Sequence, residues 1–392
     1  MKQISERVFY VGVNDDDKVL FEGLWPLPVG VSYNSYVVAD EKVALVDTVE
    51  CGFEEEFIAN IEEAIGDRQI DYLVVNHMEP DHSSLVSLML ERYPSLMIVA
   101  NAKTLPMLAG YYGVASDRVK IMAEGESLSL GTCSLSFHMI PMVHWPETMV
   151  TWLAEEGTLF SGDAFGTFGS IDDAVVDEDD TFEQYRDEMM RYYSNIVGKY
   201  GGPVQAALKK LSGLEIKRIC STHGPVWERN IGEVVALYDK MSRYETERGV
   251  CLVYGSMYGN TAAAADALAM ELEALGVPYA IHDLAGNNAG ELGISGALRD
   301  VFKYDTIVVG SPTYNNGIYP PAETFMKALQ ARMIKGRRFY AFGSYTWAGA
   351  SVRLINEMAA SMNFEILGDG MSFAQAYTRE KVDMASVAQL LK

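Results

Sequence analysis

The sequence predicts an α/β protein of two domains, and three observations support this prediction. The chain has 392 residues, which is more than one hydrophobic core usually organises. Apolar, β-branched runs typical of strands occur between helix-like stretches along its whole length. Near residue 249 an irregular mixture of strands and helices gives way to a regular alternation of the two. We therefore expect one domain at residues 1–248 and a second at residues 249–392.

The first domain is expected to contain many strands with helices interspersed among them. Its predicted strands are 7–13, 35–40, 42–48, 71–76, 96–100, 118–123, 133–140, 148–154, 158–163 and 216–222. Its predicted helices are 53–66, 83–93, 103–113 and 181–213. A helix at 231–249 is expected to join the two domains, which favours a fixed pair over a flexible one.

The second domain alternates strand and helix with little between them. Its predicted strands are 249–256, 279–284, 305–311, 338–345 and 364–370. Helices follow these strands at 261–276, through 298–303, at 321–330, at 349–361 and at the C-terminus. Five strands alternating with five helices predict a doubly wound, parallel five-stranded sheet.

Composition excludes several kinds of partner and site. The formal net charge of −23 makes nucleic acid and anionic membranes improbable partners. The four cysteines are scattered and form no CxxC pair, so we expect no disulfide framework, iron–sulfur cluster or zinc ribbon. No signal peptide or apolar run of membrane-spanning length is evident. These features predict a cytoplasmic protein.

A loop that can bind phosphate follows the first strand of the second domain. In VYGSMYGNTAAAAD (253–266) the strand ends in hydroxyl, amide and glycine residues and a helix begins at once, so backbone N–H groups are available to a single phosphate. The alternative is a plain strand-to-helix turn. The loops at 311–320 and 343–349 favour a ligand, because they leave the same sheet edge and carry the aromatic residues Tyr314, Tyr345 and Trp347.

This loop resembles the phosphate loop of flavodoxins, with Tyr258 in place of a threonine of the family pattern. The resemblance implies that the second domain is flavodoxin-like and that its ligand is FMN. The implied FMN-binding residues are Ser256, Met257, Tyr258, Gly259, Asn260, Thr261, Pro312, Thr313, Tyr314, Asn315, Asn316, Gly317, Ser344, Tyr345, Thr346, Trp347, Ala348 and Gly349.

A second cluster of polar residues lies in the first domain. The stretch VVNHMEPDHSS (74–84) follows a predicted buried strand and contains His77, Glu79, Asp81 and His82. Such a loop could be a solvated turn in which Asp81 caps a helix starting at Ser83. If the loop is extended, alternate residues could instead point at one metal ion.

Three more polar residues, each after an apolar strand, favour the metal site. They are His144, Asp163 and His223. With the four residues of the loop they form a set of four histidines and three carboxylates, which is enough for two ions. Carboxylate and imidazole ligands favour iron or manganese over metals that prefer thiolates. Asp163 is the natural bridge, because a carboxylate can span two cations.

This pattern resembles the metallo-β-lactamase fold, an αβ/βα sandwich with its metal site at one edge. Zinc hydrolases of that superfamily generally carry H-x-H-x-D-H, whereas Glu79 occupies the second histidine position in this chain. Glu79 together with the flavodoxin-like second domain identifies the chain as similar to flavodiiron proteins over essentially its whole length. The resemblance implies that His77, Glu79 and His144 bind one iron, that Asp81, His82 and His223 bind the other, and that Asp163 bridges them. Family members differ in whether the histidine at the position of His82 reaches the metal.

The family resemblance also implies an activity and its partners. Flavodiiron proteins reduce dioxygen to water or nitric oxide to nitrous oxide with FMN and a di-iron centre. The flavin of one subunit passes electrons to the di-iron site of its partner in a head-to-tail dimer, so we expect a homodimer or homotetramer. No rubredoxin-like CxxC motif or NAD fingerprint is present, so the expected donor is external, such as rubredoxin or reduced deazaflavin.

Two other functions remain possible from the sequence. One is a zinc-dependent hydrolase with the flavodoxin-like domain as a docking module, and the other is an electron-transfer protein whose first domain is only structural. The preference between oxygen and nitric oxide stays open, with Trp145, Phe165 and Tyr193 as candidate neighbours of the metal centre. No catalytic residue is predicted beyond the metal ligands, and His138 and His282 are interpreted as structural.

Overall fold

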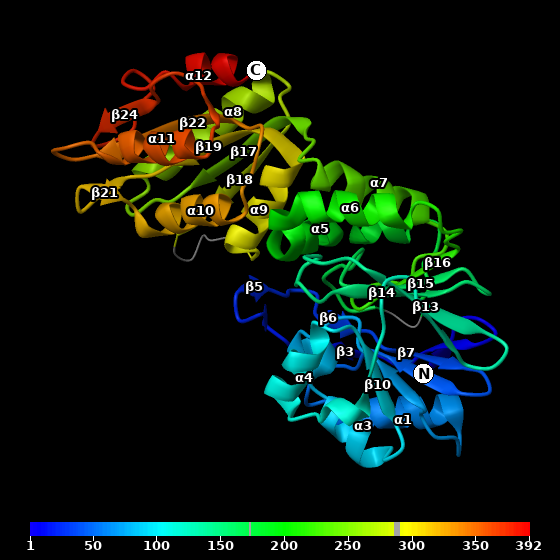
Figure 1. The fold of residues 1–392 in the computed structure, drawn as a ribbon. Helices are drawn as coiled ribbons and strands as arrows, with labels where there is room; N and C mark the ends of the chain where they lie inside the picture. Colours follow the sequence, from blue (N-terminus) through cyan, green and yellow to red (C-terminus); the bar gives the residue numbers. More distant parts are fainter. Residues whose placement is uncertain (172–173, 286–290) are drawn as a thin grey trace. The chain divides into compact units, whose positions relative to one another are not determined.

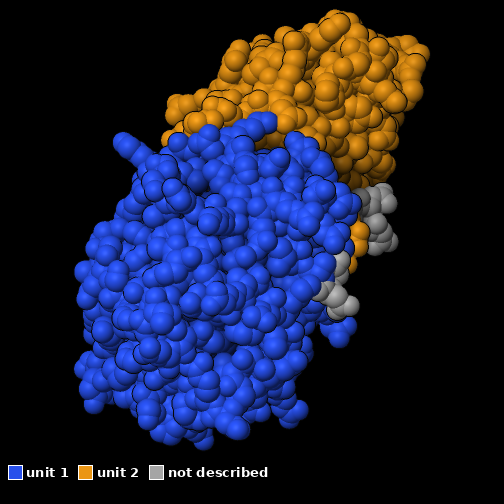
Figure 2. All heavy atoms as spheres, turned by 90° about the vertical axis from the view of Figure 1, so that its right-hand side faces the viewer, with its two compact units in different colours: residues 1–19, 29–193, 200–242 blue, residues 20–28, 194–199, 243–392 orange. Residues whose placement is uncertain are grey.

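The computed structural model describes residues 1–171, 174–285 and 291–392, which form two compact units (Figure 2). The first unit comprises residues 1–19, 29–193 and 200–242, and the second comprises 20–28, 194–199 and 243–392. The predicted domain boundary between residues 248 and 249 lies inside strand β17 (Glu247–Tyr254) and stays a prediction.

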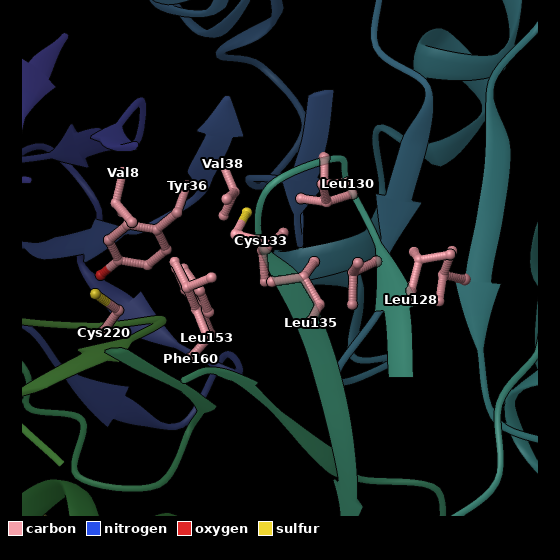
Figure 3. Packing of buried hydrophobic residues seen from close by; sticks show 14 of the residues in the cluster. Val8, Tyr36, Val38, Leu128, Leu130, Cys133, Leu135, Leu153, Phe160 and Cys220 are labelled. Carbon is pink, nitrogen blue, oxygen red and sulfur yellow. The ribbon is translucent and has the colours of Figure 1, made fainter. Parts of the chain in front are cut away.

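The first unit contains two sheets whose facing sides form its core. The seven-stranded sheet has the order β1 (Lys2–Gln3), β2 (Val8–Tyr10), β7 (Tyr36–Ala39), β8 (Val43–Val46), β9 (Tyr72–Val74), β10 (Met97–Ala100) and β11 (Val119–Ile121). The five-stranded sheet has the order β12 (Ser127–Ser129), β13 (Ser134–Met139), β14 (Met149–Leu153), β15 (Thr158–Gly162) and β16 (Arg218–Ser221). Figure 3 shows side chains of both sheets in one buried cluster, among them Val38 of the first sheet and Phe160 of the second.

Helices cover the outer faces of these two sheets (Figure 1). They are α1 (Glu54–Ile65), α3 (Val86–Arg92) and α4 (Thr104–Tyr112) on the side of the first sheet, and α5 (Thr181–Tyr192), α6 (Gly201–Leu211) and α7 (Ile231–Ser242) on the side of the second. Burial of every third or fourth residue, such as Phe57, Ile61 and Ile65 of α1, explains why these amphipathic segments pack there. The predicted αβ/βα sandwich is confirmed.

The second unit is built on a parallel sheet with the order 2-1-3-4-5 of flavodoxin-like folds. Its strands are β18 (Tyr279–Asp283), β17, β19 (Tyr304–Gly310) and β22 (Arg338–Tyr345), with β23 (Glu365–Ile366) and β24 (Met371–Ala374) both paired with β22. Its helices are α8 (Asn260–Ala274), α9 (Gly293–Lys303), α10 (Pro320–Ala331), α11 (Ser351–Ser361) and α12 (Met384–Leu391). The doubly wound parallel sheet is confirmed, although two short strands share its fifth position.

Three predicted elements need correction. The single helix at 181–213 is two helices, because a π-helical turn at Tyr193–Val197 and a 3-10 turn at Gly198–Tyr200 separate α5 from α6. Glycines at 198, 201 and 202 lower the helix propensity of this stretch. The joining helix ends at Ser242, and β17 begins at Glu247. The helix at 83–93 is preceded by a separate short helix, α2 (Pro80–Ser83).

None of the helices in the described ranges is long and apolar enough to cross a membrane.

Candidate functional site

Seven polar side chains from four loops of the first unit meet at one edge of its two sheets. The loop after β9 supplies His77, Glu79, Asp81 and His82, the loop between β13 and β14 supplies His144, and Asp163 and His223 follow β15 and β16. Each loop starts where a buried strand ends, so the sheets fix where the side chains leave the core. These are the seven residues that the sequence predicts as ligands.

The first group consists of His77, Glu79, His144 and Asp163, and its potential ligand atoms lie within 4.8 Å of one another. His144 Nε2 lies 2.9 Å from a Glu79 oxygen and 3.0 Å from Asp163 Oδ2. His77 Nε2 lies 3.3 Å from the same Glu79 oxygen. Two imidazole nitrogens therefore face the same two carboxylates.

The second group consists of Asp81, His82 and His223, and its ligand atoms also lie within 4.8 Å of one another. His82 Nε2 and His223 Nε2 each lie 3.3 Å from Asp81 Oδ2. Asp81 is not the cap of a helix starting at Ser83, because α2 already begins at Pro80 and Asp81 is only 9% exposed. The solvated-turn interpretation is therefore wrong. The loop is also not extended throughout, since Asp81 and His82 lie on this helical turn.

Asp163 connects the two groups. Its Oδ2 faces His144, while its Oδ1 lies 2.9 Å from His82 Nε2. Thr222 also donates to Oδ1, at 2.6 Å, which fixes the orientation of the carboxylate. Asp163 is 1% exposed, so this arrangement is enclosed by protein. Each oxygen is thus available to a different group, as a bridging carboxylate requires.

Hydrogen-bond acceptors orient two of the histidines through Nδ1, the ring nitrogen that does not face the ligand group. His77 Nδ1 donates to Glu147 Oε1 at 2.9 Å, and His223 Nδ1 donates to the carbonyl oxygen of Ser32 at 2.7 Å. With the proton on Nδ1, the lone pair of each Nε2 is directed toward its group. Glu147 was not predicted from the sequence. Its position three residues after His144 is a signal that could have found it.

The aromatic neighbours differ in part from those predicted. Trp145 packs edge-on against His77, with ring centroids 5.2 Å apart. The rings of Phe165 and Tyr193 contact Tyr238. Instead, the ring of Tyr192, which the sequence analysis missed, packs against His223 with centroids 5.4 Å apart.

The donor set fits a pair of metal ions. The two carboxylate oxygens of Asp81 form no hydrogen bond within the described residues, although this side chain is buried. Buried polar groups normally have partners, and leaving them without any is costly. A cation held by the second group would satisfy these lone pairs, and the carboxylate and imidazole donors of both groups suit iron.

Three imidazoles of this cluster, those of His77, His82 and His144, have a raised pKa. Burial alone lowers the pKa of His82, but Asp81 and Asp163 outweigh it and raise this pKa to about 9. Burial likewise lowers the pKa of His144, while Asp163 and Glu79 raise it to about 9. The pKa of His77 is also raised, against the effect of burial, mainly by Asp163 and Glu147.

We expect metal binding to the apoprotein to release about three protons near pH 7.5, one each from His77, His82 and His144, because a ligating imidazole must be neutral. Metal affinity should therefore rise with pH until the pKa of about 9 is passed. Anaerobic calorimetry with Mn²⁺ in buffers of different ionisation enthalpy measures the release. Repeating the titration above pH 9 should give fewer protons. Binding without proton release at neutral pH would contradict this description of the cluster.

The second unit forms a groove from the three predicted FMN-binding loops. It is lined by Ser256, Met257, Tyr258, Asn260, Thr261, Pro312, Thr313, Ser344, Tyr345, Thr346 and Gln375. All except Gln375 belong to the predicted set. The sequence analysis missed Gln375, which follows β24, because the fifth strand was expected to end at residue 370.

The groove and the loops that form it carry features that suit a phosphate and a flat ring. Helix α8 starts at Asn260 directly after Gly259, whose φ of +85° favours glycine, so the helix N-terminus faces the loop. The Ser256 hydroxyl is buried without a hydrogen-bond partner among the described residues. Tyr258 and Trp347 are 89% and 85% exposed, so their faces are available to a ring. These features fit FMN.

Replacing Ser256 with alanine is expected to weaken FMN binding by about 10- to 100-fold, because one hydrogen bond to a charged phosphate is lost. Riboflavin, which has no phosphate, should bind equally well to the variant and the wild type. Quenching of flavin fluorescence by the apoprotein measures both affinities. Ser361→Ala, an exposed position on α11, is the matched control. An equal loss for both flavins would show that Ser256 does not contact the phosphate.

Comparison with known proteins gives two family matches and several relatives. Residues 31–224 match the family described as ODP family beta lactamase, and residues 252–386 match flavodoxin. The anaerobic nitric oxide reductase flavorubredoxin of Vibrio vulnificus is 31% identical over 92% of this chain and 73% of its own length.

Solved structures show the same two-part architecture. The rubredoxin oxygen:oxidoreductase of Desulfovibrio gigas has a TM-score of 0.91 and 26% identity, over 100% of this chain and 96% of that one. The flavodiiron protein of Giardia intestinalis also has a TM-score of 0.91, with 27% identity over 100% of this chain and 94% of that one.

Proposed function

This chain belongs to the flavodiiron protein family, and on that premise we propose that it reduces dioxygen to water, nitric oxide to nitrous oxide, or both. It is an oxidoreductase whose cofactors are FMN and a di-iron centre. The observation that carries the proposal is the pair of buried ligand groups that share Asp163. Two redox-active ions so placed could act together on one small gas molecule.

We propose the following ligands for the iron pair. His77, Glu79 and His144 would hold the first ion, Asp81, His82 and His223 would hold the second, and Asp163 would be shared between them. The distances within each group and the two-sided position of Asp163 support this assignment. Glu79 adds a hard oxygen donor to the first position, which favours iron over zinc.

The chain's own residues prepare the site for this chemistry. When bound, the flavin supplies one- or two-electron transfer and the iron pair supplies a place where a diatomic gas is held and reduced. Trp145 and Tyr192 pack against ligand imidazoles and exclude water from that side of the centre. Glu79 and Asp81 keep side-chain exposures of 12% and 11%, so these two carboxylates are not fully closed off from solvent.

Electron supply is proposed to come from an external donor such as rubredoxin or a reduced deazaflavin. In this proposal the electrons pass through FMN to the di-iron site of a partner subunit in a head-to-tail homodimer or homotetramer. The names of two relatives, a flavorubredoxin and a rubredoxin oxygen:oxidoreductase, support a rubredoxin-type donor. A cytoplasmic location belongs to the same proposal, since free thiols such as the exposed Cys51 fit a reducing compartment.

The proposed reaction is tested by measuring the consumption of oxygen and of nitric oxide with gas electrodes in the presence of a reduced electron donor. We expect turnover of at least one gas with a rubredoxin-type donor and only slow reduction of the FMN by NADH alone.

Sedimentation at assay concentration should show a dimer or tetramer. An active monomer would reject the route between subunits, and a fully loaded protein that consumes neither gas would reject the proposed function.

A further inference from the structure

The buried carboxylate of Glu147 lies behind the first ligand group. Glu147 is 1% exposed, and its Oε1 accepts hydrogen bonds from His77 Nδ1 at 2.9 Å and from the backbone N–H of Met78 at 3.0 Å. Its other oxygen, Oε2, has no hydrogen-bond partner within the described residues. Asn101 donates to the backbone carbonyl of Glu147 and helps to fix this part of the loop. The Glu147 side chain is therefore held directly behind His77.

In the second group no carboxylate of the described residues accepts a hydrogen bond from the Nδ1 of a ligand histidine, and the buried Asp47 interacts electrostatically with both His82 and His77. His223 Nδ1 donates to a neutral backbone carbonyl, that of Ser32. His82 Nδ1 is buried and makes no hydrogen bond within the described part of the chain. The two groups share Asp163 and each has one further carboxylate, Glu79 or Asp81. The hydrogen bond between His77 and the charged side chain of Glu147 thus distinguishes the first position from the second.

We propose that Glu147 is a positioning residue that makes the first position bind its metal ion more tightly, so that this position fills before the second. The inference rests on the proposed di-iron centre. A carboxylate that accepts the Nδ1 proton of a ligating histidine fixes the tautomer and the ring orientation and makes Nε2 a stronger donor. A backbone carbonyl, as behind His223, fixes the tautomer without adding a full charge.

Glutamine at position 147 separates charge from hydrogen bonding. Its carbonyl oxygen can still accept from His77 and Met78, while the amide group takes the place of Oε2 and the charge is lost. Alanine removes the charge and both hydrogen bonds. We expect Glu147→Gln to weaken the tighter binding step by about 10-fold and Glu147→Ala by about 100-fold, with the weaker step changed by less than about 3-fold.

Anaerobic titration of the apoprotein with Mn²⁺, followed by electron paramagnetic resonance, reads the two steps separately. In the wild type, the first equivalent of Mn²⁺ should give the resonance signal of an isolated ion. The second equivalent should reduce that signal, because the two bound ions then couple magnetically. In a protein that also carries Asp81→Asn, the second group is impaired, so the Mn²⁺ ion that still binds should be the one at the first position. Adding Glu147→Gln to this variant should weaken the binding of that ion by the same factor of about 10. Glu124→Gln, a half-exposed carboxylate beside His138 and outside both groups, is the matched control.

The outcomes distinguish the inference from the proposed function. Selective weakening of the tight step, with the melting temperature of the apoprotein little changed, supports the role of Glu147. If the wild type binds two ions but Glu147→Gln leaves both metal affinities unchanged, or lowers both equally, the proposed role of Glu147 is wrong. The proposed metal centre is still supported by that result. If the wild-type apoprotein binds no Mn²⁺ or Fe²⁺, the proposed metal centre itself fails.

Discussion

Replacing Asp163 with asparagine is expected to reduce the metal content from about two ions per chain to about one and to lower gas reduction by at least about 100-fold. The two oxygens of Asp163 face different groups, 3.0 Å from His144 and 2.9 Å from His82. An asparagine has one carbonyl oxygen and an NH₂ group that cannot bind a cation. One group must therefore lose the ligand that it shares with the other.

Metal analysis after anaerobic purification and gas-electrode assays measure this effect. Asp300→Asn is the matched control, because Asp300 is also a buried, ion-paired carboxylate but lies in the second unit. The Asp300→Asn variant should have the same metal content as the wild type and the same melting temperature for its first unit. A variant at position 163 that retains two ions and full activity would show that this carboxylate does not bridge the groups.

Replacing Glu79 with histidine is expected to shift the metal preference from iron toward zinc and to lower gas reduction by at least about 10-fold, because an imidazole takes the place of a hard oxygen donor. The Glu79 carboxylate lies 2.9 Å from His144 and 3.3 Å from His77, so the change acts directly on the first group. It also creates the H-x-H-x-D-H pattern typical of zinc hydrolases in the superfamily.

Competition between Fe²⁺ and Zn²⁺ for the apoprotein measures the preference directly. Glu55→His, an exposed position on α1, is the control for adding a histidine. The control should bind the two metals in the same ratio as wild type. If the variant at position 79 retains the iron occupancy and activity of wild type, the weight placed on Glu79 is mistaken.

Much of the fold follows from short-range patterns. The alternation of apolar strands with helices in the second unit, such as β17 followed by α8, predicts a doubly wound sheet because parallel strands need crossover helices. The apolar strands of the first unit were also recognisable. Helix ends were less predictable, since π and 3-10 turns such as Tyr193–Val197 depend on tertiary packing as well as on the local sequence.

The candidate site was predictable to the extent that its residues follow strands. His77, Asp163 and His223 each come at the end of a β-strand, where a sheet brings distant segments together. The contacts behind them were not predictable, because Glu147 and Ser32 reach the imidazoles only through the three-dimensional packing of separate loops. The same reason applies to Gln375, which lines the flavin groove directly after β24, a strand that was not predicted at that position.

The most direct test of the account is quantitative metal and flavin analysis of the protein purified without oxygen and without added metal. We expect about two irons and one FMN per chain, since the seven ligands form two groups and the described part of the second unit forms a groove at the phosphate loop. Zinc in place of iron would support the hydrolase with a docking module and contradict the gas reductase.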